Sequence, residues 1–515
     1  MTDVDARRFC FAAWLALCAL SFFWNLGGAL LYDVDEGAFS EATREMLERH
    51  DFVTTYLNGQ LRFDKPILIY WLQALSVTLF GLHEWTFRLP SALAASGWLW
   101  AIMVFVQRRL DPFTAVIATA LAGTAVGVLI IGRVATADAL LNLCLCAALL
   151  DAYRYIESGR RAQLLRVYAW MGVGMLTKGP VALLVPCMVT AIYFASTGRM
   201  RAWVRAIADP VGWLLLLAIA LPWYLLEFHE QGLLFFKGFF LRHNVERFTD
   251  PLQGHTGAWF YYVPATLVML LPHSGLFLRI LPSVRSYWRD PLDRFLWTWF
   301  AFVLVFFSFA GTKLPHYILY GATPLFILMA RHRSVLRSRW LAYGPALALL
   351  ALLLALPELL AWQAPRIRNP YFAQTISAGL GEFGSLYRLT AAAGFLVVAF
   401  VAFKHPRDSG AGLAVAGLAV ALVLTSVVIP TLSAIQQGPV VAAAQFVSSR
   451  GENVVAWGVN VPSFSVYRNA VTPVRPPAQG ELALTREDRR SELPPHTVLF
   501  SRGALRVVRI DGPPR

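Results

Sequence analysis

The sequence is poor in charged residues. Only 15% of its 515 residues are Asp, Glu, Lys or Arg, whereas about a quarter of the residues in an average soluble domain are charged. Apolar residues make up 57% of the chain, and the mean hydropathy is +0.54. This composition excludes an ordinary soluble globular protein and predicts a chain that lies in a lipid bilayer.

Cysteine is also scarce, and the few cysteines lie in apolar stretches. Their spacing is unlike that of metal ligands, and none lies in a polar segment where an oxidising compartment could pair it. The five are Cys10, Cys18, Cys144, Cys146 and Cys187. We therefore expect no disulfide.

The sequence lacks a cleavable signal and a solvated basic domain. The first apolar run, residues 9–31, is longer than a signal-peptide core and has no small-residue cleavage site, so it is expected to stay as an anchor. The net charge is +14, but Lys and Arg punctuate apolar runs instead of sharing one polar domain. This distribution argues against nucleic-acid binding and indicates membrane orientation. No solenoid or propeller repeat is evident.

Long apolar runs recur along the whole chain. Runs of roughly 17 to 25 residues, the length of a membrane span, begin at thirteen places. They start near Phe9, Arg88, Phe113, Asp138, Leu164, Gly179, Val211, Trp259, Phe295, His316, Trp340, Tyr387 and Ala411. The run at residues 66–81 is shorter and has charged motifs on both sides, which favours a re-entrant or interfacial helix. The sequence predicts an all-α polytopic bundle of about thirteen transmembrane helices.

Arginine and lysine gather in alternate connections, such as residues 154–166, 199–205 and 331–339. By the positive-inside rule these connections are cytoplasmic. The N-terminus is then cytoplasmic, and an odd number of spans puts the tail in the periplasm of a bacterial inner membrane. We expect a transmembrane domain over residues 1–430, with a periplasmic loop at 32–87, and a small periplasmic α/β domain over residues 431–515.

The unusual polar clusters fall on the predicted periplasmic side. Asp33, Asp35 and Glu36 follow the first span and open a predicted amphipathic helix. Phe39, Ala42 and Met46 recur at helical spacing opposite Glu41 and Glu45, which predicts that this helix lies on the membrane surface. Such acids can simply cap a helix or interact with its dipole. Three acids in four residues at a bilayer boundary exceed what capping needs, and a carboxylate there can act as a base or order a sugar. This favours Asp35 as a catalytic residue, with Glu36 beside it.

Lys65 lies between Asp64 and Pro66, directly before an apolar, aromatic segment. Taken alone, it is more often a lysine whose chain reaches the interface and pairs with the neighbouring acid. Lysine also binds phosphate as a point charge, and a lipid-borne phosphate lies at this depth. The spacing thus makes Lys65 a candidate phosphate ligand.

The other predicted outer connections hold further cations, acids and histidines. Each alone is more often an anchor or a structural residue. Together they indicate binding of a phosphate-bearing lipid. The candidates for the carrier phosphate and sugar are Asp138, Lys178, Arg247, Lys313, His316 and Tyr317, with His243 nearby.

A series of short motifs between residues 33 and 317 resembles the GT-C membrane glycosyltransferases of the protein-O-mannosyltransferase and aminoarabinose (lipid A) transferase type, in the family's order and at its loop positions. The motifs are Asp33-Val34-Asp35-Glu36, Arg44-Glu45-Met46, Leu57-Asn58-Gly59, Phe63-Asp64-Lys65-Pro66, Tyr70-Trp71-Leu72, Arg88-Leu89-Pro90-Ser91, Thr177-Lys178-Gly179-Pro180, Pro222-Trp223-Tyr224, His243 to Phe248 and Lys313-Leu314-Pro315-His316-Tyr317. In the tail, Pro462 to Tyr467 resembles a segment of the bacterial members' periplasmic domain.

The resemblance implies an undecaprenyl-phosphate sugar donor and an acceptor reached from the periplasm, such as lipid A, lipopolysaccharide or another envelope glycolipid. Asp35 matches the family's acid near the reacting sugar, and Lys65 matches a residue that holds the carrier phosphate. Asp64 stands where aminoarabinose transferases have a glutamate that helps a histidine like His243 to bind zinc. Ala38 stands where those enzymes have an arginine. No cofactor is required, although a divalent metal, zinc or magnesium, is possible.

The chemistry needs stabilisation of the departing phosphate more than a strong acid. Lys65 and Arg247, supported by Lys313 or Tyr317, form the predicted clamp. Asp35 serves as general base for a hydroxyl acceptor, or orients and stabilises the sugar carbon for a phosphate acceptor. Three alternatives stay open: a protein O-mannosyltransferase-like enzyme that acts on envelope proteins, an O-antigen ligase, and a flippase for polyprenyl-linked glycans.

Overall fold

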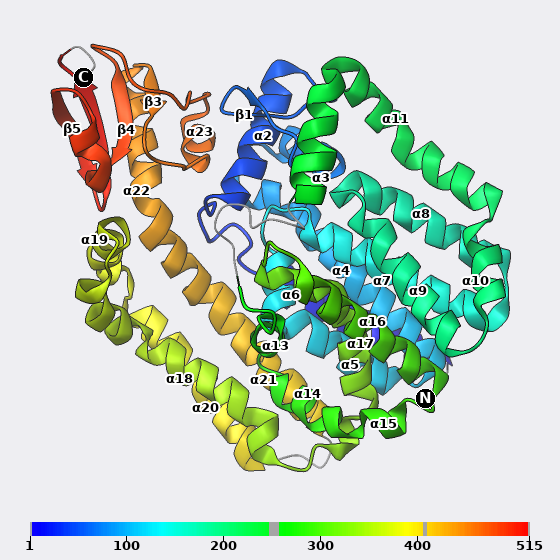
Figure 1. The fold of residues 1–515 in the computed structure, drawn as a ribbon. Coiled ribbons are helices and arrows are strands. Elements are labelled where there is room, and N and C mark those ends of the chain that lie inside the picture. Colours follow the sequence, from blue (N-terminus) through cyan, green and yellow to red (C-terminus); the bar gives the residue numbers. More distant parts are fainter. Residues whose placement is uncertain (1–2, 247–256, 405–408, 513–515) are drawn as a thin grey trace.

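The computed structural model describes residues 3–246, 257–404 and 409–512. Long helices form a bundle, and a small sheet lies at one end of it beside the short elements α2 (Asp35–Arg49), β1 (Tyr56–Leu57) and β2 (Gln60–Leu61) (Figure 1). We call this end the loop side. The chain is a multi-pass membrane protein.

The first half of the bundle is formed by consecutive helices. α1 passes without a break into the π-helix η1, and α3 is the short apolar helix predicted at residues 66–81. The elements are α1 (Asp3–Cys18), η1 (Ala19–Phe23), α3 (Leu68–Phe80), α4 (Glu84–Arg109), α5 (Pro112–Thr124), α6 (Val126–Ile131), α7 (Asp138–Ser158), α8 (Arg161–Lys178), α9 (Val181–Ser196), α10 (Met200–Ile207), α11 (Pro210–Phe235) and the π-helix η2 (Phe236–Glu246).

The second half contains two interrupted segments. Residues 259–280, predicted as one span, form α13 (Tyr262–Met269) and α14 (Ser274–Ile280) on either side of Pro272, and the segment that begins at His316 starts as the 3₁₀-helix η5 (Pro315–Gly321). The remaining helices are α15 (Val284–Tyr287), α16 (Pro291–Phe309), α17 (Ala322–Arg331), α18 (Arg339–Gln363), α19 (Pro370–Gly379), α20 (Ser385–Lys404), α21 (Ser409–Val423), the π-helix η9 (Leu424–Val428), α22 (Ile429–Arg450) and α23 (Ser463–Arg468).

Within the described residues, eight helices are long and apolar enough to cross a membrane, and α3, α5 and α9 are shorter apolar helices. Helical segments lie at each of the predicted spans, but the count of thirteen stays a prediction. α7 lies at the centre of the bundle, because 83% of its most apolar stretch is buried. α18 and α20 lie at the periphery, where the buried share of the same stretch is 22% in each helix.

Three spans begin with the same local signal. An aspartate precedes a proline at Asp111, Asp209 and Asp290, and each aspartate accepts backbone N–H groups of the first turn. Proline at the first helical position has no N–H to satisfy, and the aspartate caps the others. The sequence thereby fixes where α5, α11 and α16 start.

The C-terminal sheet has the order β3-β4-β6-β5. β3 (Val454–Ala456) is parallel to β4 (Leu482–Arg486), whereas β5 (His496–Arg502) and β6 (Leu505–Ile510) complete the sheet in antiparallel register. α22 covers one face through Val440 and Val447, which share a core with Leu484 and Val507. The predicted small α/β domain is confirmed.

The link between bundle and sheet is helical throughout. α21, η9 and α22 follow one another without a gap from Ser409 to Arg450. The predicted dividing line between residues 430 and 431 falls inside this helix, and the division into domains 1–430 and 431–515 stays a prediction.

α2 is more deeply buried than a helix on a membrane surface would be. Phe39, Ala42 and Met46 form the expected apolar face, but Glu41 and Glu45 on the other face are also buried. Both acids are paired within the helix, Glu41 with Arg44 and Glu45 with Arg49. The expected exposed acidic face is therefore absent, because α3 and α23 pack against this helix.

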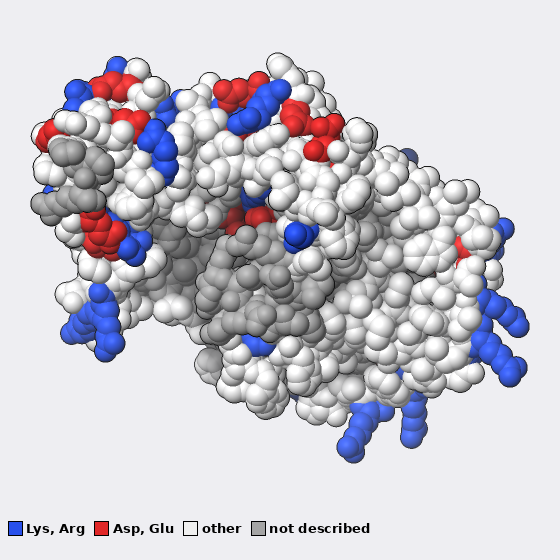
Figure 2. All heavy atoms as spheres, turned by 45° about the horizontal axis from the view of Figure 1, so that its top comes forward, with Lys and Arg blue, Asp and Glu red and all other residues white. Residues whose placement is uncertain are grey.

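Charged side chains gather at the ends of the molecule. In Figure 2, Lys, Arg, Asp and Glu lie over the loop side and the sheet, while Lys and Arg dominate the opposite rim, and a broad band between them carries almost no charge. Such a band is the surface that a helical membrane protein presents to lipid.

Candidate functional site

A cavity of about 330 Å³ opens on the loop side, between the segment that follows η1 and the start of η5. Its polar lining includes Asp33, Asp35, Asp138 and His316. Its other walls are apolar and come from α6, the connection after α6, and the end of α13: Ile130, Ile131, Val134 and Met269. Acidic atoms are visible in a hollow of this face in Figure 2. The cavity thus joins a charged end to an apolar wall.

Asp35 is the first residue of α2 and is exposed to the cavity. The N-cap position is Val34, and no side chain caps the helix. Among the described residues, none donates a hydrogen bond to the Asp35 carboxylate. The capping interpretation of this acid is therefore not supported, and its carboxylate is available to a bound molecule.

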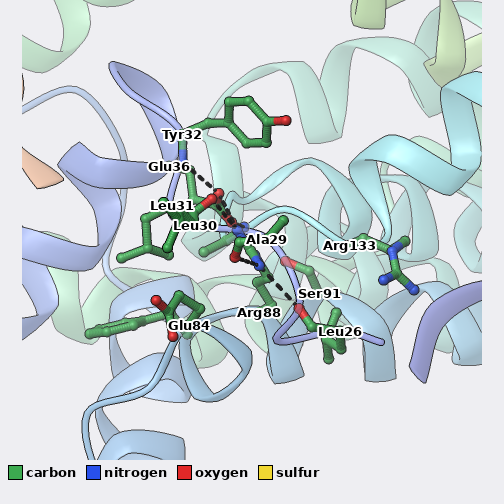
Figure 3. A network of polar contacts seen from close by, with 12 residues as sticks. Leu26, Ala29, Leu30, Leu31, Tyr32, Glu36, Glu84, Arg88, Ser91 and Arg133 are labelled. Atoms are coloured by element: carbon green, nitrogen blue, oxygen red, sulfur yellow. Dashed lines mark hydrogen bonds and ion pairs between the residues drawn. The ribbon is translucent and has the colours of Figure 1, made fainter. Parts of the chain in front are cut away.

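Glu36 has a different environment, shown in Figure 3. Both of its oxygens accept hydrogen bonds from Arg88, Nε to Oε1 at 2.7 Å and a terminal nitrogen to Oε2 at 2.8 Å. The backbone N–H groups of Tyr32 and Ala135 complete its partners at 2.9 Å each. Both members of the pair are buried. Glu36 is placed to hold the chain together.

Arg88 extends this network to the segment after η1. Its guanidinium donates to the carbonyl oxygens of Leu26, Ala29 and Leu30 at 3.0, 2.6 and 2.9 Å. These carbonyls would otherwise be buried without partners, at a cost of about 1 to 3 kcal/mol each. The Glu36–Arg88 pair therefore fixes the segment that carries Asp33 and Asp35.

Asp138 is the centre of a second polar cluster. It is the first residue of α7, and its Oδ1 accepts from Lys178 Nζ at 2.5 Å and from the Tyr320 hydroxyl at 3.1 Å. His316 Nε2 lies 3.5 Å from the same oxygen. Lys178 also donates to Tyr320 at 2.8 Å and stands 5.3 Å from the centre of the Tyr317 ring. The structure thus brings Asp138, Lys178, His316 and Tyr317 together.

Lys65 joins this cluster from the loop before α3. Its Nζ donates to the Asp64 carbonyl oxygen at 3.0 Å, and it is near enough for its charge to act on the Asp138 carboxylate. The side chain is half-buried. Two lysines from separate segments, Lys178 by direct contact and Lys65 by its charge, therefore act on the Asp138 carboxylate.

Lys313 is directed elsewhere. It is buried, and its Nζ donates to the carbonyl oxygens of Ser308 and Ala310 at 2.7 and 2.9 Å, at the end of α16. Burial lowers the pKa of its ammonium group. This geometry favours a helix-capping role for Lys313 over a place beside Lys178.

The predicted metal pair is only partly described. The Asp64 carboxylate lies 3.5 Å from Arg62 Nε. His243 belongs to η2, but its side chain lies outside the described part of the chain, as does the whole of Arg247. The described residues contain no group of three His, Cys, Asp or Glu side chains that could hold a metal ion. A zinc site at Asp64 and His243 stays a prediction.

Sequence reasoning missed Tyr320, Arg88 and Asp33 as contributors. Tyr320 follows Tyr317 at a spacing of three residues, which is one turn of the 3₁₀-helix η5, and this spacing was a usable signal. Asp33 accepts hydrogen bonds from Ser463, which lies 430 residues later in the chain. Burial raises the pKa of Asp33 to about 7.

Residues 64–225 match the family described as dolichyl-phosphate-mannose-protein mannosyltransferase. The chain is also similar to curated proteins named undecaprenyl phosphate-alpha-4-amino-4-deoxy-L-arabinose arabinosyl transferase. The identity is 32% to the protein of Serratia proteamaculans, over 61% of this chain, and 31% to that of Yersinia pestis strain Pestoides F, over 63% of this chain. The matches span 57% and 59% of those relatives' own lengths.

Two solved structures share the fold over nearly the whole chain. ArnT from Cupriavidus metallidurans bound to undecaprenyl phosphate superposes with a TM-score of 0.82 at 21% identity, covering 98% of this chain and 99% of that one. The apo form gives a TM-score of 0.80 at 21% identity, covering 97% of each chain. In sequence and in fold, the chain is similar to the GT-C membrane glycosyltransferases of the protein-O-mannosyltransferase and aminoarabinose-transferase type.

Proposed function

We propose that this protein is a glycosyltransferase that moves a sugar from undecaprenyl phosphate to an envelope glycolipid, lipid A or lipopolysaccharide, on the periplasmic face of the inner membrane. One observation carries the proposal. The exposed carboxylate of Asp35 borders the same cavity as Asp138 and His316, and Lys178 forms an ion pair with Asp138. The names of the relatives and the lipid in the ArnT structure agree with this chemistry.

The lysines account for binding of the carrier phosphate. Lys178 forms an ion pair with Asp138 at 2.5 Å, and the charge of Lys65 acts on the same carboxylate, so two cations are available near a bound phosphate. A cation roughly 4 Å from a phosphate contributes on the order of 4 kcal/mol at an effective dielectric of about 20, before desolvation. The apolar wall of the cavity suits the first isoprene units, since a hydrocarbon chain leaves water on contact with it.

The transfer step breaks the bond between the anomeric carbon of the sugar and the carrier phosphate oxygen. A new bond forms between that carbon and an acceptor oxygen, and the carrier phosphate leaves with the electron pair. Lys65 and Lys178 stabilise the charge that grows on the phosphate. With a hydroxyl acceptor, Asp35 takes the proton; with a phosphate acceptor, it stabilises the positive anomeric carbon.

The other predicted residues are assigned by their contacts. Glu36 is a positioning residue, because both of its oxygens are bound by Arg88. His316 and Tyr317 border the bound phosphate and sugar. Lys313 stabilises the end of α16. Arg247 completes the phosphate clamp in this proposal.

The decisive experiment is transfer by the purified protein in detergent from synthetic undecaprenyl-phosphate 4-amino-4-deoxy-L-arabinose to lipid A, read by mass spectrometry. The expected product is lipid A heavier by one aminoarabinose residue. In parallel, lipid A and envelope proteins are compared by mass spectrometry in cells with and without the gene. A sugar lost from envelope proteins and not from lipid A would instead support the protein mannosyltransferase alternative, which the family match at residues 64–225 favours.

A further inference from the structure

The short helix α23 contacts the loop side through every second residue. The Ser465 hydroxyl donates to Asn58 Oδ1 at 2.9 Å. Tyr467 accepts from the Leu31 N–H at 2.8 Å and donates to Glu84 at 3.2 Å. Ser463, Ser465 and Phe464 are buried. This segment belongs to the tail motif that sequence comparison singled out and that the proposed transfer reaction does not use.

Ser463 reaches closest to the candidate site. Its backbone N–H donates to Asp33 Oδ1 at 2.9 Å, and its hydroxyl donates to Oδ2 at 2.5 Å. Gln437 of α22, with its amide nitrogen toward Asp33, donates to Oδ2 at 2.9 Å and accepts from the Asp33 N–H at 3.0 Å. Ser463 and Gln437, both from the C-terminal part of the chain, therefore hold Asp33 through hydrogen bonds. Asp33 lies two residues before Asp35.

Gly37 shows how closely α23 and α2 approach. A Cβ atom at this position would lie 2.1 Å from Asp33 Oδ1 and 2.8 Å from the Ser463 nitrogen. Only glycine fits at position 37 while α23 is docked in this way. The two helices therefore pack so closely at Gly37 that no side chain fits between them.

We propose that Ser463 is a positioning residue for the transfer reaction, which fixes the catalytic Asp35 by holding Asp33. The inference rests on the proposed function. The Asp35 carboxylate accepts no hydrogen bond from the described residues, so its place is set by the backbone on either side. Glu36 and Arg88 hold the chain after it, and Asp33 with Ser463 holds the chain before it.

Small displacements matter at such a site. A shift of about 1 Å in a catalytic group can cost about a hundredfold in rate. Loss of the Ser463 hydroxyl leaves the Ser463 N–H and Gln437 bound to Asp33, so a smaller displacement follows. We expect Ser463→Ala to lower kcat by about tenfold, with KM for the undecaprenyl-phosphate donor unchanged, because the lysine cluster lies on other segments.

The matched control is Ser465→Ala. Both serines are buried in the same helix, and both hydroxyls donate one hydrogen bond to the N-terminal half of the chain. Only Ser463 contacts the Asp33 segment. Equal kcat values for the two variants, in a preparation where the wild type transfers sugar, would overturn the positioning role and leave the proposed function standing.

A readout without substrate separates the two hypotheses. Amide hydrogen exchange over residues 31–38 is expected to speed up in Ser463→Ala and to stay at the wild-type rate in Ser465→Ala. If the wild type transfers no sugar, the proposed function fails, and the exchange data still decide whether Ser463 fixes this segment. Unchanged exchange in Ser463→Ala would overturn the inference.

A second variant tests the same contact from α2. Gly37→Ala is expected to push α2 from α23 and to lower kcat at least as much as Ser463→Ala. Gly438→Ala, in α22, is the control, because a Cβ there meets nothing within 4 Å. Wild-type kcat and exchange in Gly37→Ala would contradict the proposed close contact.

Discussion

Asp35 and Glu36 are adjacent acids with opposite environments, and this contrast leads to the first prediction. Asp35→Asn keeps the size of the side chain and removes its charge, so sugar transfer is expected to fall by at least a hundredfold. The melting temperature in detergent should stay at the wild-type value, because no described residue pairs with the carboxylate. Near-normal single-turnover rates in Asp35→Asn would rule out the catalytic role.

Lys65 provides the second prediction at this scale. Lys65→Ala is expected to weaken binding of undecaprenyl phosphate and to slow the chemical step, because the phosphate gains charge as the glycosidic bond breaks. Lys65→Arg should restore only part of both, since a planar guanidinium places its charge differently. Lipid binding and single-turnover transfer measure the two effects. Full rescue by arginine would indicate a lysine that merely reaches the membrane interface.

Asp33 gives a prediction about pH. Burial raises its pKa from 3.8 to about 7, so the folded protein binds this proton more tightly than the unfolded chain. The contribution of this group to the free energy of unfolding is therefore greatest below about pH 4 and declines as the pH rises toward 7. Melting temperatures between pH 4 and 8 should fall less steeply in Asp33→Asn than in the wild type. Parallel curves would assign the slope to other groups.

At the scale of elements, the Glu36–Arg88 pair ties α2 to α4 and to the segment after η1. Glu36→Ala leaves a buried guanidinium without its carboxylate, which costs about 3 to 5 kcal/mol. We expect a markedly lower melting temperature in detergent. Glu358→Ala is the control, because its ion pair with Arg388 lies on the surface, with 55% and 54% of the two side chains exposed. Equal melting temperatures for the two variants would contradict the structural role of Glu36.

The helices were predicted well where the local sequence of a segment is enough to determine its structure. The long apolar runs located the helices. The break at Pro272 and the 3₁₀-helix η5 were not predicted from the sequence, because both lie in apolar runs that count as whole spans. The end of a span and the start of the sheet domain were separated at residue 430, but the helix continues to Arg450.

The site was predictable to the extent that its chemistry lies in short motifs. Lys178, Asp138 and His316 were each predicted from a separate motif. In the fold, Lys178 and His316 both lie near the Oδ1 atom of Asp138. The partner of Glu36 is 52 residues away, and the carbonyl partners of Lys313 depend on how α16 ends. Such contacts depend on tertiary packing and cannot be predicted from local sequence. The contacts of Glu36 and Lys313 therefore do not favour the catalytic and phosphate-binding roles predicted for them.

At the scale of the whole molecule, the orientation in the membrane is the property to test. The arginine-rich connections predict a cytoplasmic N-terminus and a periplasmic sheet domain. Alkaline phosphatase fused after Arg515 should therefore be active, and a fluorescent cytoplasmic reporter at the same place should be dark. The reverse pattern would move the cavity to the cytoplasmic face and exclude the proposed donor.

The peripheral position of α18 and α20 fits the same arrangement. Only 22% of the most apolar stretch of each helix is buried, so most of the apolar surface of the two helices is available to lipid. The remainder packs between the two helices and against α21. The cavity lies between the segment that follows η1, α6 with the connection after it, the end of α13 and the start of η5, and neither α18 nor α20 contributes a described residue to its lining.

The contact between Asp33 and Ser463 also has a consequence for biosynthesis. The two residues are separated by 430 positions, so Asp33 is synthesised long before its partner has been translated. During synthesis the early helices can insert and pack, but the loop that carries Asp35 can reach its final shape only when the last tenth of the polypeptide has left the ribosome. A nascent chain that stops early would therefore place its early spans in the bilayer, and the segment around Asp33 and Asp35 would still lack its C-terminal partner.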